Sequence, residues 1–211
     1  MQLLQKITAA KKFWEWFTEN QDQYRQLIKL EEDEMMALFD EINERVQQYC
    51  SKLEVNISLG DMAVHTLIIS ANGNVDYFEA VDDLVRMAPR LRQWTFIALR
   101  PPADEWPIEF TYEGLKISVD RLWFAPMLHD DEPHKLGIMV YFKGYKKNKE
   151  DIYFGAANEM LERLLGERAS ALDVPYLGVD VYPGEQTDLT IWEMANLESY
   201  IAFWKETVMM N

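Results

Sequence analysis

The sequence predicts an α+β fold: antiparallel or mixed sheets with helices on one face, and additional helices at both termini. Three observations carry this prediction. Apolar residues recur with helical spacing through the first fifty residues, they alternate with polar ones in later segments, and the order strand, strand, helix, strand occurs twice. With 211 residues, 48% of them hydrophobic, the chain can bury a substantial core. We expect one compact domain, 1–211, built from two similar halves at about 1–102 and 103–211.

The first half begins with two amphipathic helices. Phe13, Phe17, Tyr24 and Ile28 are expected on one buried face, and a second apolar stripe runs through residues 35–49. Strict alternation at 53–59 and a buried run at 64–70 then predict a β-hairpin. A helix is expected to begin at the polar residues 72–74 and to end at Pro89, and a strand follows at 94–99.

The second half contains more strands. Alternation on either side of Glu113 and Gly114 predicts a tight hairpin. Residues 122–127 are expected as a further apolar strand, which would make a β-meander, or as an irregular edge. A core strand at 136–142, a helix from about Glu150 that stops at Gly166, and a strand at 177–181 complete the unit. A last amphipathic helix is expected from 194 or 195 to about 208. Because both halves share this order, we interpret them as an internal duplication of pattern.

The net charge and the cysteine content indicate which partners and which cellular compartment to expect. The chain has 36 Asp and Glu against 21 Lys and Arg, a net charge of −15, which opposes binding to nucleic acid and to anionic membranes. Cys50 is the single cysteine, so no intramolecular disulfide can form. No apolar run approaches the ~20 residues of a membrane helix, and the N-terminus lacks the features of a signal peptide. We expect a cytoplasmic protein with neither nucleic acid nor membrane as its partner.

One loop gathers side chains that could bind a metal ion. His129, Asp131 and His134 lie within six residues, and imidazole nitrogen and carboxylate oxygen are ligands of divalent metals. A metal-dependent enzyme or other hydrolase with its site here is one hypothesis. The alternative interpretation is a solvated acidic loop, because the spacing matches no established metal motif.

Tryptophans and one arginine are the candidates for a binding surface. Trp14 falls about 100° away from the direction of Phe13 and Phe17 on the helix, while Trp106 and Trp123 lie near predicted strand ends or loops. Aromatic side chains outside the core commonly anchor protein interfaces. Arg100 follows a predicted strand and is a candidate for an ion pair or a ligand. No glycine-rich phosphate loop is present, so no cofactor is expected.

Several short segments resemble a group of bacterial proteins catalogued only as a domain of unknown function. These segments are FWEWF at 13–17, ISANGN at 69–74, AP at 88–89, WTFIALRP at 94–101 and LLGE at 164–167. The resemblance implies a bacterial α+β protein, with Trp94, Arg100, Gly166 and Glu167 as family features. It implies no catalytic residue, cofactor or substrate.

These observations favour a protein that binds another protein and catalyses no reaction. An acidic surface bearing aromatic side chains suits a regulatory partner that covers a basic active site, as small acidic inhibitors and immunity proteins do. Self-association through the terminal helices is a further hypothesis.

Overall fold

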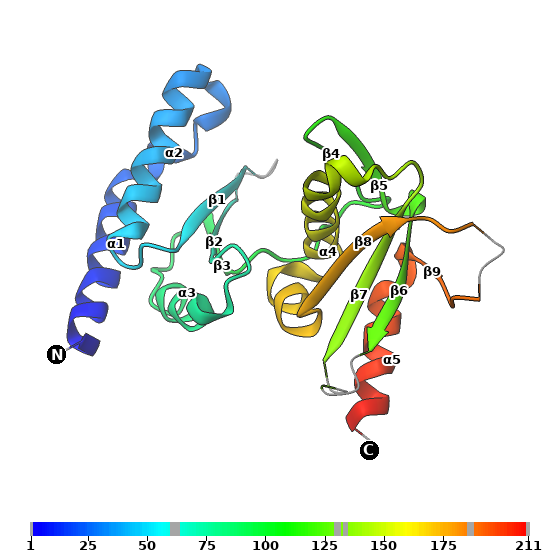
Figure 1. Cartoon of the computed structure of the whole chain (residues 1–211). Helices are drawn as coiled ribbons and strands as arrows, with labels where there is room; N and C mark the ends of the chain where they lie inside the picture. The colour runs from blue at the N-terminus through cyan, green and yellow to red at the C-terminus, as the bar shows by residue number, and fades with distance from the viewer. Residues whose placement is uncertain (1, 60–63, 129–131, 133–134, 185–187, 210–211) are drawn as a thin grey trace. The chain divides into compact units, whose positions relative to one another are not determined.

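The computed structural model describes every residue except 1, 60–63, 129–131, 133–134, 185–187 and 210–211 (Figure 1). The chain divides into two compact units, Met1–Arg100 and Pro101–Asn211, called here the N-terminal unit and the C-terminal unit. Each unit combines helices with a sheet that contains parallel and antiparallel pairs, which confirms the α+β class.

The N-terminal unit is a three-stranded sheet with helices packed against it. Strand β1 pairs with β2 in an antiparallel hairpin, and β3 pairs with β2 in parallel after a crossover through α3. The first two helices and the hairpin confirm the sequence predictions for this unit. The elements in chain order are α1 (Gln2–Tyr24), η1 (Leu27–Lys29), α2 (Glu32–Gln47), β1 (Glu54–Leu59), β2 (His65–Ser70), η2 (Val75–Tyr77), α3 (Phe78–Arg86) and β3 (Trp94–Ala98).

Aromatic rings form much of the core of this unit. Trp14 is only 4% exposed, and its indole N–H donates a 2.8 Å hydrogen bond to the carbonyl oxygen of Leu84. The expectation that Trp14 lies outside the core is therefore wrong: α1 is covered on a broader face than the Phe13 and Phe17 stripe, because it meets both α3 and β3. Ile28 is 80% exposed, which also corrects the prediction, since α1 ends at Tyr24 and the η1 turn redirects the chain.

The C-terminal unit repeats the same strand pairing within a larger sheet. Strand β6 pairs antiparallel with β7, and β8 pairs in parallel with β7 after a crossover through α4. The four-stranded order is β8-β7-β6-β9. The elements are β4 (Glu109–Tyr112), β5 (Leu115–Ser118), η3 (Val119–Arg121), β6 (Leu122–Leu128), β7 (Leu136–Phe142), η4 (Lys147–Lys149), α4 (Glu150–Asp173), β8 (Tyr176–Val181), β9 (Trp192–Glu193), η5 (Met194–Asn196) and α5 (Leu197–Met209).

The structure corrects one prediction for this unit and extends another. Strands β4 and β5 form a separate two-stranded sheet, so no meander continues into β6; the η3 turn redirects the chain between β5 and β6. The helix that begins at Glu150 is interrupted at Gly166, as predicted, where the backbone is non-helical with φ 78° and ψ 160°. A second helical segment, which was not predicted, continues α4 to Asp173. This ψ is far from the value of about 47° that a left-handed helix cap requires, so Gly166 acts as a kink within α4.

We expect acid to destabilise the N-terminal unit through His65. Its side chain is 9% exposed against Trp94, and burial, followed by the positive charge of Arg25, holds its pKa below the usual 6.5. The unfolded chain thus binds a proton at a pH where the folded chain does not. The free energy of unfolding therefore falls as the pH drops below 6.5, and this loss is complete once the pH lies below the folded-state pKa.

Urea unfolding of the wild type and of His65→Gln, between about pH 7.5 and 5, checks this expectation. The variant should lose less stability over that range than the wild type. Identical pH dependence in the two proteins would contradict the assignment to His65.

Candidate functional site

The sheet of the C-terminal unit has two chemically different faces. Strand alternation places Phe124, Ile138, Val140 and Val179 on one face, where they join helices α4 and α5 in the hydrophobic core. The residues between them point to the opposite side, and none of them belongs to that core. We call this second side the open sheet face; it comprises Trp123, Ala125, Met127, Gly137, Met139, Tyr141, Tyr176, Gly178 and Asp180.

Methionines lie flat over glycines at the centre of the open sheet face. A Cβ atom added to Gly137 would approach Met127 Cβ to 3.0 Å, and one added to Gly178 would approach Met139 Cε to 2.8 Å. The absent glycine side chains therefore make room for the two thioethers. Both methionines remain partly exposed. Methionine is unbranched and polarizable, so such a surface can adapt its shape to an apolar partner.

A pair of tilted aromatic rings, Trp123 and Tyr182, lies at one end of the open sheet face. The ring centroids of Trp123 and Tyr182 are 4.3 Å apart. The ammonium of Lys143 lies 4.4 Å from the Trp123 centroid and 5.2 Å from that of Tyr182. Cation–π attraction of this kind, worth about 0.5–1 kcal/mol at an exposed site, favours this arrangement of the rings. Trp123 is therefore held in place as a partly exposed aromatic group.

The other end carries a tyrosine within a polar network. The Tyr176 hydroxyl donates a 2.5 Å hydrogen bond to Glu132 Oε2, and Lys135 Nζ donates one of 2.5 Å to Glu132 Oε1. The hydrogen bond to Glu132 raises the pKa of Lys135. Together these contacts anchor the Tyr176 ring, so aromatic groups are fixed at both ends of the open sheet face.

A carboxylate borders the centre of the face. Asp180 is paired with Tyr141 in the register of β7 and β8, and its side chain is exposed. Burial, and secondly the charge of Asp180, raise the pKa of Tyr141. Tyr141 itself is only 7% exposed, so the solvent-exposed polar side chain of this pair is Asp180.

The structure places the predicted binding residues in four different settings. Trp123 lies on the open sheet face, whereas Trp14 is a core residue of the other unit. Trp106 is 62% exposed, outside the two larger sheets. Arg100 follows β3, where its guanidinium donates a 3.1 Å hydrogen bond to Asn72 Oδ1.

The metal candidates His129, Asp131 and His134 lie outside the described residues. Within the described part of the chain, no three His, Cys, Asp or Glu side chains are grouped so that they could hold a metal ion. The described helices also include none with the length and apolar character needed to cross a membrane.

Sequence reasoning found Trp123 and missed its neighbours. Met127 and Met139 were expected only as parts of strands, Tyr176 lies just before the predicted strand 177–181, and Tyr182 was not singled out. The available signal was the alternation within 122–127 and 136–142, where both sets of alternate residues are apolar. Such a pattern shows that both faces of a strand are apolar, but it does not show which face the helices cover.

Comparisons with known proteins add no further information: this chain matches no family model, no curated protein and no solved structure. The resemblance to a bacterial family therefore stays a prediction.

Proposed function

We propose that this protein binds another protein through the open sheet face of its C-terminal unit. The observation that carries the proposal is the combination on that face of fixed aromatic rings at both ends with two adaptable methionines between them. Tyrosine, tryptophan and methionine are enriched at the centres of protein interfaces, where a few large side chains supply most of the binding energy.

Charge identifies the kind of partner. The C-terminal unit contains twenty Asp and Glu against ten Lys and Arg, whereas the N-terminal unit contains sixteen against eleven. The excess of negative charge is thus larger in the unit that bears the open sheet face. Asp180 lies on that face, between the cations Lys143 and Lys135 at its two ends. A protein with a basic surface, such as an enzyme with a basic active site that is to be covered, is the complementary partner.

The test compares substitutions on the face with one elsewhere in the same unit. A partner is captured from the source cells at low salt, identified, purified, and titrated with each variant by calorimetry. We expect Trp123→Ala and Met139→Lys each to weaken binding at least about tenfold, because they remove an anchor or add a cation that faces a basic surface. The control is Phe203→Ala on α5, which removes a side chain that is 66% exposed.

Three results would count against this function. A purified partner that binds Trp123→Ala and Met139→Lys as tightly as the wild type does not use this face. Equal weakening by Phe203→Ala would point to a general loss of structure. An affinity that does not fall between about 0.05 and 0.5 M salt would contradict the charge argument.

A further inference from the structure

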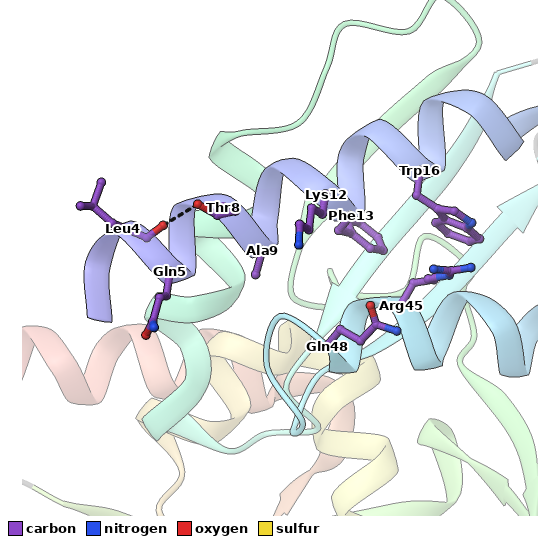
Figure 2. A pocket seen from close by; sticks show the side chains of 9 residues that line it. All are labelled: Leu4, Gln5, Thr8, Ala9, Lys12, Phe13, Trp16, Arg45 and Gln48. Atoms are coloured by element: carbon purple, nitrogen blue, oxygen red, sulfur yellow. Dashed lines mark hydrogen bonds between the residues drawn. The ribbon is translucent and has the colours of Figure 1, made fainter. Parts of the chain in front are cut away.

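A groove between two helices of the N-terminal unit forms a second candidate site (Figure 2). It lies between the first half of α1 and the end of α2, and its volume is about 700 Å³. This volume is within the usual range of ligand pockets, about 300–1,000 Å³. The lining residues that matter for binding are Ala9, Lys12, Phe13, Trp16, Arg45 and Gln48.

Apolar and cationic groups are segregated within this groove. Phe13 is 3% exposed and forms part of the floor, and its ring centroid lies 6.3 Å from that of Trp16. The Arg45 guanidinium lies 5.1 Å from the Trp16 centroid, and Lys12 extends from α1 toward the same space (Figure 2). The groove therefore offers an aromatic floor beside two positive charges.

The lining of the groove is positive, although the net charge of the chain is −15. Its charged lining residues are Lys12 and Arg45, and no acidic residue is among them. Arg45 already forms one ion pair, with Glu41 on the same helix at 3.8 Å. Lys12 and Arg45 together can still attract an anion to the groove.

We infer that the groove binds a small amphipathic anion, that is, one carboxylate or similar acid group attached to an apolar chain or ring. The acid group pairs with Arg45 and Lys12, and the apolar body lies over Phe13 and Trp16 in place of water. Arginine suits a carboxylate because its planar N–H groups can donate two parallel hydrogen bonds. Gln5 and Gln48 supply further donors at the edge of the groove.

Calorimetric titration with decanoate, below its micellar concentration, tests this inference. We expect saturable binding that Arg45→Gln weakens about tenfold, because a hydrogen-bonded charge pair contributes on that scale. Lys12→Glu should also weaken it. Lys11→Glu is the matched control, since it makes the same charge change on the adjacent residue, which lines a different depression. Decyltrimethylammonium, with the same chain length and a positive charge, should not bind.

A substitution that fills the groove distinguishes the contribution of the cavity to decanoate binding from the contribution of its positive charges. Ala9→Trp leaves Lys12 and Arg45 in place but occupies the cavity, so it should abolish decanoate binding while circular dichroism shows a folded helix. The inference is overturned if decanoate produces no binding heat, if the cationic analogue binds equally well, if Lys11→Glu weakens binding as much as Lys12→Glu, or if Ala9→Trp has no effect. Binding only to vesicles of anionic lipid, and not to monomeric decanoate, would overturn it as well.

Discussion

Phe17→Ala is expected to lower the free energy of unfolding of the N-terminal unit by about 3–5 kcal/mol, the usual cost of deleting a fully buried phenylalanine ring. The Phe17 side chain is 0% exposed. It links α1 to the sheet, because its ring lies 5.0 Å from that of Trp94 and 5.7 Å from that of Phe96. The substitution leaves a cavity between a helix and a strand, and neither can close it without moving other aromatic rings.

Urea unfolding followed by hydrogen exchange and mass spectrometry measures this effect locally. Peptides from Met1–Arg100 should lose protection at lower urea, while peptides from Pro101–Asn211 serve as an internal reference. Ile28→Ala is the control within the same unit, because Ile28 is 80% exposed and removal of an exposed side chain usually changes stability by no more than about 0.5 kcal/mol. A cost for Phe17→Ala close to that of Ile28→Ala would show that the aromatic core is not packed as described.

The sequence pattern correctly predicted those helices and strands whose buried face follows from the spacing of their own apolar residues. Ile42 and Val46 on α2 are fully buried, as their spacing indicates, and the alternation in β1 fits its pairing with β2. Trp14 and Ile28 were misplaced because their environment depends on distant segments: α3 and β3 cover Trp14, and the η1 turn leaves Ile28 in solvent. Neither effect can be predicted from the spacing of the apolar residues along α1.

The candidate sites were harder to predict for the same reason. Met127 lies over Gly137, and Met139 over Gly178, only because β6, β7 and β8 pair in one particular register. Likewise, Lys12 and Arg45 are 33 positions apart in sequence and share a groove only through the contact between α1 and α2. Sequence composition identified aromatic side chains as candidates, whereas their grouping follows from tertiary structure.

Gly166→Ala is expected to destabilise the C-terminal unit by about 1–3 kcal/mol, although alanine is the better helix former. Gly166 is buried and interrupts α4 with φ 78° and ψ 160°, a backbone conformation that is essentially restricted to glycine. An alanine there must either adopt this strained conformation or straighten α4, and straightening would displace the residues that pack against the sheet on one side of the break. The same exchange measurement reads the effect in peptides from Pro101–Asn211.

Leu172→Ala, an exposed position in the last part of α4, is the control and should be nearly neutral. If Gly166→Ala instead stabilises the unit, α4 can continue through residue 166 as an unbroken helix, and the kink is not required by the packing around it.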